Sequence, residues 1–155
     1  MDLKEEMRSE PVSHLDLSGF VMVNSGTPVR AVISLMQQEG AKVCLVAHDE
    51  HLIGIFTVRD VLCKVVSEPS TWDKPIDDVM TPNPITITLE ASAADALWLM
   101  NEKRIRDLPA LDNSGKIVGN MTNQTIINYL AARYPTDILN LPPRPDQFPD
   151  QVEGG

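Results

Sequence analysis

An internal repeat constrains this 155-residue chain more than any other feature of its sequence. The segment VRAVISLMQQEGAKVCLVAHDEHLIGIFTVRDVL resembles the later segment AADALWLMNEKRIRDLPALDNSGKIVGNMTNQTII. Leu35-Met36 aligns with Leu99-Met100, 64 positions later, and Thr57 aligns with Thr122, 65 positions later. Two copies of a unit of about 65 residues therefore fill residues 18–134.

Each copy predicts the same order of secondary structure, β-α-β-β-α. In the first copy we expect a helix that Thr27 caps and Gly40 ends, a second helix at 58–66, and strands at 20–23, 43–47 and 52–56. In the second copy we expect helices from Ser92 and at 123–133, and strands at 85–89, 108–111 and 117–121. Helical spacing predicts the buried faces of the two first helices: Val29, Val32, Ile33 and Met36 in one, and Ala93, Ala96, Leu97 and Met100 in the other.

One copy has too small a core to fold alone, so we expect an α/β (α+β) fold in which two repeats pack sheet to sheet with pseudo-twofold symmetry. The chain then divides into an N-terminal segment (1–17), a first repeat (18–66), a linker (67–78), a second repeat (79–134) and a proline-rich C-terminal tail (135–155). Three apolar residues could dock that tail on a surface: Leu139, Leu141 and Phe148.

The charge balance argues against a nucleic-acid partner, because 22 acidic residues stand against 13 basic ones and the formal net charge is −9. A small anion is still compatible with the local basic run at 103–106. No apolar run approaches the ~20 residues of a membrane helix, and the charged N-terminus is unlike a secretory signal. Cys44 and Cys63 lie in apolar segments, where we expect buried free thiols, and we expect a cytoplasmic protein.

Three motifs within the repeat are similar to those of a known family: GIFTVRD at 54–60, VMTPNPITI at 79–87 and RDLP at 106–109. With them, residues 18–134 resemble a tandem pair of cystathionine β-synthase (CBS) domains, often called a Bateman module. The resemblance implies a regulatory module that binds an adenosyl small molecule in clefts between the repeats, namely AMP, ADP, ATP or S-adenosylmethionine. It also implies a homodimer in which two such pairs form a flat disc.

The resemblance further implies the residues of one cleft: Thr57 and Asp60, with Pro84, Ile85, Thr86, Arg104, Arg106, Leu108 and Pro109. A carboxylate near a helix start can accept both hydrogen bonds of a ribose 2′,3′-diol. Arg106, with Arg104 or Lys103, can donate to phosphate, and Ile85 and Pro109 offer apolar surface to a purine. Asp107 follows Arg106 where family members often have a second basic residue, which favours a ligand with fewer charges, such as AMP.

The second cleft would use Lys42, Val43, Thr122 and Thr125. It lacks the acid, because Thr125 stands where the first repeat has Asp60. Leu45 also stands where the second repeat has Pro109. We therefore expect this cleft to be empty or weak, and the module to have one competent site.

Simpler interpretations exist for several of these residues. Thr57-x-x-Asp60 is also a helix-capping pattern, although Thr122-x-x-Thr125 begins the equivalent helix without an acid. Arg106 could be only a solvated charge near a helix end. The segment His48-Asp49-Glu50-His51 contains metal-ligand residue types, but its place between two strands predicts a solvated hairpin turn and no metal site. The segment Pro142–Pro145 could be a polyproline ligand for a partner domain.

The sequence as a whole predicts a stand-alone regulatory module and not an enzyme, because it has no glycine-rich phosphate loop, no His-Glu-x-x-His and no visible nucleophile–base pair. It would signal through its dimer geometry to an unidentified effector protein, with no nucleic acid or membrane involved. The alternative is a structural dimerisation module, or scaffold, that binds no ligand because side chains close its clefts.

Overall fold

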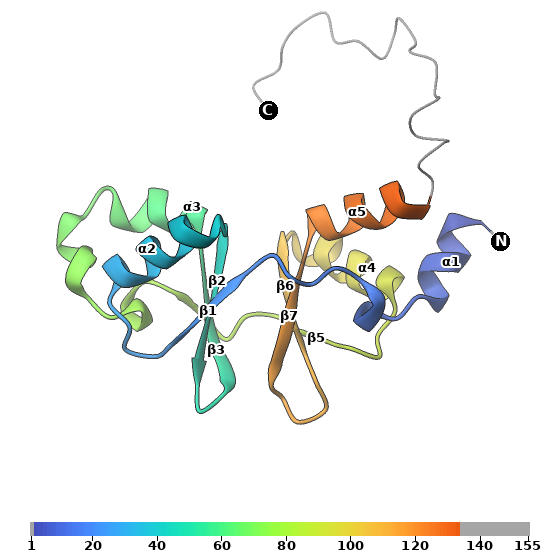
Figure 1. Ribbon diagram of the computed structural model, residues 1–155, viewed down its shortest axis with the longest axis horizontal. Helices are drawn as coiled ribbons and strands as arrows, with labels where there is room; N and C mark the ends of the chain where they lie inside the picture. The colour runs from blue at the N-terminus through green and yellow to red at the C-terminus, as the bar shows by residue number, and fades with distance from the viewer. Residues whose placement is uncertain (1, 134–155) are drawn as a thin grey trace, which may run out of the picture.

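A computed structural model describes residues 2–133 of the chain. Two sheets face each other in the middle of the molecule, with helices on their outer sides (Figure 1). The first sheet has the order β1 (Val21–Asn24), β2 (Val43–His48), β3 (His51–Thr57) and β4 (Thr81–Pro82). The second has the order β5 (Ile87–Thr88), β6 (Asp107–Leu111) and β7 (Ile117–Thr122). The predicted α/β fold of two repeats packed sheet to sheet is confirmed.

The two repeats use the same topology. In each, a leading strand pairs in parallel with the next strand, which then forms an antiparallel hairpin. The helices are α1 (Leu3–Ser9), α2 (Val29–Glu39), α3 (Val58–Asp60), α4 (Ala93–Lys103) and α5 (Asn123–Arg133). A π-helical turn at Val61–Val65 continues α3, and 3-10 turns lie at Val12–His14, Pro69–Asp73 and Ile76–Asp78.

Each sheet buries one face against its own helices, so the molecule has two apolar cores. The core of the first repeat contains residues of α2 and of the hairpin β2-β3, among them Val29, Val32, Cys44, Val46 and Phe56. The core of the second repeat contains the corresponding residues Ala93, Ala96, Leu108, Ala110 and Met121. The other faces of the two sheets meet between the repeats.

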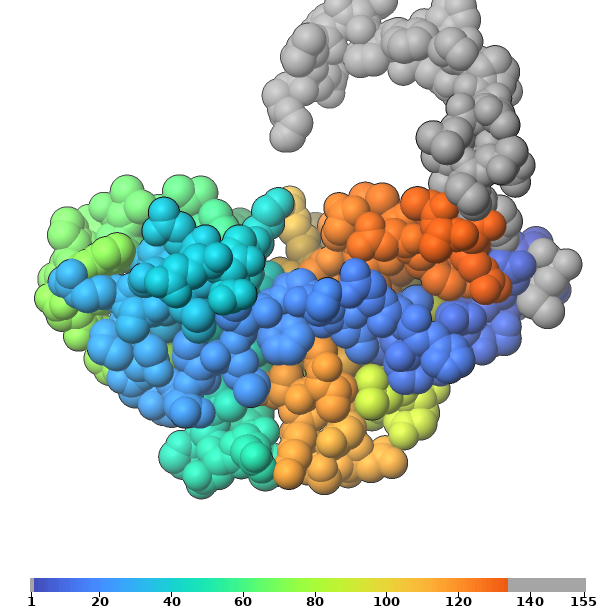
Figure 2. All heavy atoms as spheres, viewed as in Figure 1, coloured from blue at the N-terminus to red at the C-terminus, as the bar shows by residue number. Residues whose placement is uncertain are grey.

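The segment that precedes each repeat packs on the core of the other repeat. The N-terminal arm (residues 3–15) contributes Met7, Val12 and Leu15 to the core of the second repeat. The linker arm (residues 69–80) contributes Ile76 and Val79 to the core of the first. After its arm, the chain crosses the front of the molecule from the second repeat to the first (Figure 2).

The same hydrogen bonds anchor both arms. Val12 N–H donates to Ala91 O at 2.8 Å, and 64 positions later Ile76 N–H donates to Thr27 O at 2.7 Å. Pro11 likewise bridges to Ser92, as Pro75 does to Pro28. The sequence predicts a linker at 67–78 with a short helical turn from Ile76, and that turn is present at Ile76–Asp78. The segment also has a turn at Pro69–Asp73 and buried side chains, so it completes the first core.

The two hairpin tips lie together at one end of the sheets. The turn of the β2-β3 hairpin has positive φ at both Asp49 (49°) and Glu50 (68°), as a two-residue type I′ turn requires. Lys116 of the other hairpin pairs with Glu50 at 3.0 Å and bridges to His51. Because the tips meet, the opposite ends of the strands also lie at a common end of the molecule (Figure 1).

Four local predictions are wrong. Pro28 and not Thr27 occupies the N-cap of α2, and the Thr27 hydroxyl instead donates to Asn24 O at 2.7 Å. The leading strand expected at 85–89 is paired only at Ile87–Thr88, because residues 83–86 connect the two sheets and the chain turns after Thr88, whose carbonyl accepts from Ala91 N–H at 3.3 Å. Leu97 is 38% exposed, since the buried stripe of α4 runs through Ala93, Ala96 and Met100 beside it.

The fourth concerns Cys63, which is exposed because it lies on the outer side of the π-helical turn, whereas Cys44 is buried as expected. The proline-rich tail lies outside the described residues, and with it Leu139, Leu141, Phe148 and the segment Pro142–Pro145. Between residues 2 and 133, no helix combines the length and the apolar character needed to cross a membrane.

Candidate functional site

Thr57 and Asp60 lie where β3 ends and α3 begins. Asp60 Oδ2 accepts a hydrogen bond from Thr57 N–H at 2.9 Å and one from the Thr57 hydroxyl at 3.4 Å. This is the capping box that the Thr-x-x-Asp pattern predicts. A carboxylate offers about four acceptor positions, so these bonds leave Asp60 able to accept from a ligand. Its side chain is 14% exposed and therefore partly shielded from solvent.

Lys64 also contacts Asp60, which the sequence interpretation did not include. Its Nζ lies 3.2 Å from Asp60 Oδ1 and donates to Val79 O at 2.9 Å. The bond joins the helix that carries Asp60 to the linker arm, which leads into the segment 83–86. An Asp and a Lys four residues apart on a helix are a recognisable pair, and this spacing was the signal that could have identified Lys64.

The segment 83–86 connects β4 of the first sheet to β5 of the second. Asn83 N–H donates to Ile53 O at 3.0 Å, which holds the start of this segment beside β3. Ile85 is 40% exposed, while Pro84 and Thr86 are half-buried. The start of the segment that contains these predicted residues therefore lies beside β3 at Ile53, four residues before Thr57.

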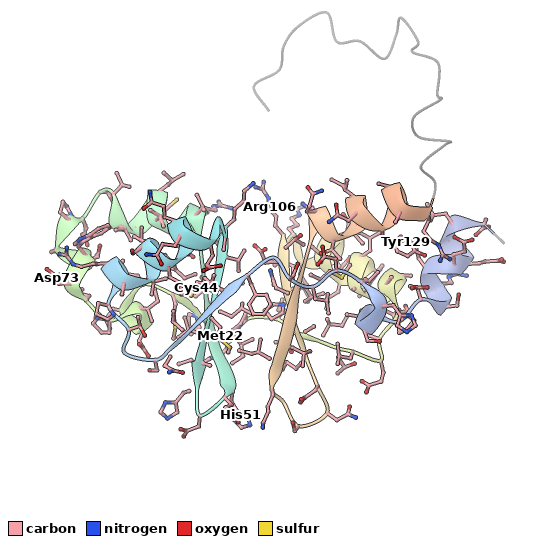
Figure 3. The ribbon with its side chains drawn as sticks, viewed as in Figure 1. Met22, Cys44, His51, Asp73, Arg106 and Tyr129 are labelled. Atoms are coloured by element: carbon pink, nitrogen blue, oxygen red, sulfur yellow. The ribbon has the colours of Figure 1, made fainter. Side chains whose placement is uncertain are left out.

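Arg104 and Arg106 are both exposed, and local structure explains where each of them lies. Arg104 ends α4 in the left-handed conformation, with φ of 53°. Arg106 precedes β6 and lies at the end of the sheets opposite the hairpin tips, between the two repeats (Figure 3). Among residues 2–133, no carboxylate forms an ion pair with Arg106, so its guanidinium is available to an anion.

Leu108 and Pro109 are fully buried, in opposite directions. Leu108 belongs to the core of the second repeat, so the structure does not bring it to the cleft. Pro109 is the next residue along β6 and therefore faces the first sheet. Of the two side chains predicted to contact a purine, Ile85 and Pro109, Ile85 is the one with exposed surface in this conformation.

A cavity of about 340 Å³ lies beside the candidate cleft and not in it. Cys63, Lys64, Thr71, Lys74 and Val79 line it, together with neighbouring polar residues. None of the residues predicted for the cleft is among them. We therefore place the candidate site by its residues and not by this cavity.

The second predicted cleft differs at Thr125. The Thr125 hydroxyl accepts from Thr122 N–H at 2.9 Å and donates to Asp16 O at 2.9 Å. Its single donor is thereby used within the fold, and the side chain is buried. Lys42 is exposed at this cleft, whereas Val43 is buried.

The hairpin turn at His48–His51 has no metal-binding arrangement. His51 Nδ1 bonds to Asp49 O at 2.8 Å, a contact within the turn itself. Across residues 2–133 no group of three or more His, Cys, Asp or Glu side chains could hold a metal ion.

Comparison with known proteins identifies relatives of both repeats. The family model of the CBS domain matches residues 3–67 and 76–132. An uncharacterized protein of Methanopyrus kandleri is 35% identical over 118 residues, which is 71% of this chain and 60% of that protein. The chain thus spans less than two thirds of the length of this relative.

Solved structures share the fold. CBSX2, solved in complex with AMP, matches with a TM-score of 0.71 at 23% identity, over 81% of this chain and 98% of that one. The CBS domain pair of protein MJ0100, solved with 5′-methylthioadenosine and S-adenosyl-L-methionine, matches with a TM-score of 0.67 at 20% identity, over 77% of this chain and 98% of that one.

Proposed function

Because the chain belongs to the CBS domain family, we propose that it is a regulatory module that binds an adenosyl ligand, with AMP favoured, in the cleft at Asp60. Two proteins of the same fold support the ligand class, since one was solved with AMP and the other with 5′-methylthioadenosine and S-adenosyl-L-methionine. In this proposal the module regulates and does not catalyse.

The observation that carries the proposal is that Asp60 and Thr125, which occupy equivalent positions in the two repeats, form different hydrogen bonds. Asp60 caps α3 and still has acceptor capacity, whereas the Thr125 hydroxyl has its donor bonded to Asp16. Capping alone needs only a hydroxyl, as Thr125 demonstrates. The carboxylate of Asp60 is therefore available for a ribose diol, and exposed Arg106 supplies donors for a single phosphate.

The regulatory part of the proposal is a homodimer whose geometry responds to the ligand. Val58, Leu62 and Val66 are spaced one helical turn apart and are exposed by 44, 65 and 66%. Ile127 of α5, the counterpart of Leu62, is 55% exposed. Such a face suits a second copy of the chain, and a ligand changes the dimer only if it binds two arrangements with different affinity.

A structural dimerisation module remains the second candidate. The full burial of Pro109 and of its counterpart Leu45 favours it, because neither side chain has surface to offer a purine in this conformation. Ligand binding would have to part the sheets slightly at this point.

The test is thermal unfolding with AMP, ADP, ATP or S-adenosylmethionine, for the wild type and for Asp60→Asn. Asp60→Asn keeps an acceptor for Thr57 N–H but loses the charge, so it separates ligand binding from capping. A ligand at about 100 times its dissociation constant stabilises the fold by roughly 2.7 kcal/mol, which raises the midpoint by about 5–10 °C for a chain of this size.

We expect a rise with AMP in the wild type and little or none in Asp60→Asn. A rise of equal size in both proteins would remove Asp60 from the site. If no ligand raises the midpoint, the structural dimerisation module becomes the better answer.

A further inference from the structure

Lys64 joins the acid of the candidate cleft to the linker arm. Its Nζ lies 3.2 Å from Asp60 Oδ1 and donates to Val79 O at 2.9 Å. Thr57 donates to the other carboxylate oxygen, Oδ2, so Lys64 bonds the oxygen that capping leaves free. A ribose diol that donates to both oxygens of a carboxylate needs a position on each of them. In this structure the lysine ammonium therefore takes an acceptor position that such a diol would use.

The second repeat shows that the fold does not need a cation at this place. Asp60 corresponds to Thr125, and Lys64, four residues later, corresponds to Tyr129. The Tyr129 hydroxyl is buried and has no hydrogen-bond partner among residues 2–133. The N-terminal arm thus packs on the second repeat without a bond of the kind that Lys64 makes to the linker arm. The lysine and the acid are present together in one repeat and absent together from the other, which connects Lys64 with the role of Asp60.

The Lys64 ammonium also has other anionic groups near it. The cavity of about 340 Å³ beside the cleft is lined by Lys64 together with two acids, Glu68 and Asp78. Both acids are exposed, and neither forms an ion pair with a residue between 2 and 133. The Lys64 side chain is 42% exposed and has a flexible stem, so it can turn from Asp60 into this cavity without a change in the fold.

We propose that Lys64 competes with the ligand for Asp60. It pairs with the carboxylate while the cleft is free, and it turns towards Glu68 and Asp78 when a ribose diol takes its place. This inference rests on the proposed function and adds to it a residue that sets the affinity for a ribose. Lys64 acts through Asp60, because the ligand replaces it there and does not bind to it.

The test is calorimetric titration of the wild type and of Lys64→Met with AMP and with 2′-deoxyadenosine 5′-monophosphate. The two nucleotides share the base and the phosphate and differ by one hydroxyl of the diol. Lys64→Met should bind AMP about two- to fivefold more tightly than the wild type, which is the range expected when a partly exposed ion pair no longer has to be broken. The affinity for the deoxynucleotide should change less, because a single hydroxyl can use another acceptor position while Lys64 stays in place.

Three further variants separate competition from a general effect of charge or stability. Lys74→Met removes the same charge from the same cavity, and Lys74 forms no ion pair within the described residues, so the ratio of the two affinities should stay at the wild-type value. Lys64→Arg keeps a charged donor and should also retain that ratio. Lys64→Gln keeps a donor for Val79 O without the charge, and should raise the ratio as Lys64→Met does if the methionine prevents folding.

Weaker binding of AMP by Lys64→Met, or a ratio equal to that of the wild type, would overturn the competition and leave the proposed function standing. If neither the wild type nor any Lys64 variant binds either nucleotide, both proposals are wrong.

Discussion

At the level of single residues, the starts of α3 and α5 are capped by different side chains in the same way. The N-cap N–H donates to Asp60 in one repeat and to Thr125 in the other, at 2.9 Å in both. A hydroxyl therefore serves the cap as well as a carboxylate does. Capping uses only Oδ2 of Asp60, and Lys64 lies 3.2 Å from Oδ1, so the carboxylate has more acceptor capacity than capping needs. This comparison within one chain supports a ligand role more strongly than the motif alone.

The ionised side chain of Asp77 accepts hydrogen bonds that support the fold. The Ser25 hydroxyl donates to it, and Gly26 N–H donates at 2.7 Å, which ties the linker arm to the first repeat. These hydrogen bonds, that of Ser25 first, hold the pKa of Asp77 below its ordinary value. A carboxyl with a lowered pKa in the folded state stabilises above its unfolded pKa of about 3.9, and that stabilisation is lost as the pH falls through the folded value.

We therefore expect Asp77→Asn to destabilise the protein by about 1 kcal/mol at pH 7, measured as a midpoint lower by about 2–4 °C. The difference from the wild type should stay constant above about pH 5 and shrink below about pH 4. Asp78→Asn removes the same charge from the exposed neighbouring side chain and serves as the control. A deficit that persists unchanged at pH 3 would contradict the role of ionised Asp77.

At the level of secondary structure, the elements with a clear apolar period could be predicted from the sequence. The helices α2, α4 and α5 and the two hairpins agree with their predicted ranges within one or two residues. The arms could not be recognised as parts of the repeat. Met7, Val12 and Leu15 are separated by polar residues without a helical or strand period, so nothing local shows that they are buried.

The glycines of β3 and β7 show how closely the crossing segments pack on the hairpins. A Cβ on Gly119 would collide with Leu17 Cβ and lie 3.1 Å from the Leu17 backbone oxygen. For a Cβ on Gly54, the equivalent position, the three nearest heavy atoms all belong to the Met80 side chain. A methionine side chain can move aside, whereas the stem and backbone of Leu17 cannot do so without moving the segment.

Gly119→Ala should therefore cost about 2 kcal/mol of folding free energy and Gly54→Ala about 1 kcal/mol or less. Chemical denaturation of the two variants measures both losses, and each glycine change is the control for the other because the strands are equivalent. The reverse order would contradict the packing described for Leu17 and Met80.

At the level of the whole molecule, the candidate site combines residues that no single repeat contains. The repeat in the sequence predicts that Asp60 follows the last strand of the first repeat and that Arg106 precedes the hairpin of the second. It does not predict the direction of each side chain, because that depends on which face of a strand meets the other sheet. Leu108 and Pro109 are adjacent in the sequence and point into different parts of the molecule. Alternation along β6 could have separated them, although only the packing of the sheets shows that Pro109 is fully covered.

The exposed apolar face of α3 and α5 leads to a prediction about assembly. Replacing Leu62, which is 65% exposed, by glutamate would place a charge at the centre of this face. If two copies meet there, Leu62→Glu should convert a dimer into a monomer, because burying an unpaired charge is strongly unfavourable.

Light scattering and sedimentation over a range of concentrations would measure the change. Val118→Glu, at a site 41% exposed on β7, is the matched control and should remain dimeric. A wild type that is monomeric at every concentration, or a dimeric Leu62→Glu, would exclude this face as the interface.

The exchanged arms make each repeat depend on the other. A fragment that ended after the first repeat would keep an arm with no core to cover, and a core whose Ile76 and Val79 were missing. This fragment and the remaining half of the chain could complete each other only by meeting in solution. Joining them in one chain replaces that encounter with an effective concentration in the millimolar range. Each half therefore needs the other to complete its core. Two half-length fragments produced separately should fold only when they are mixed.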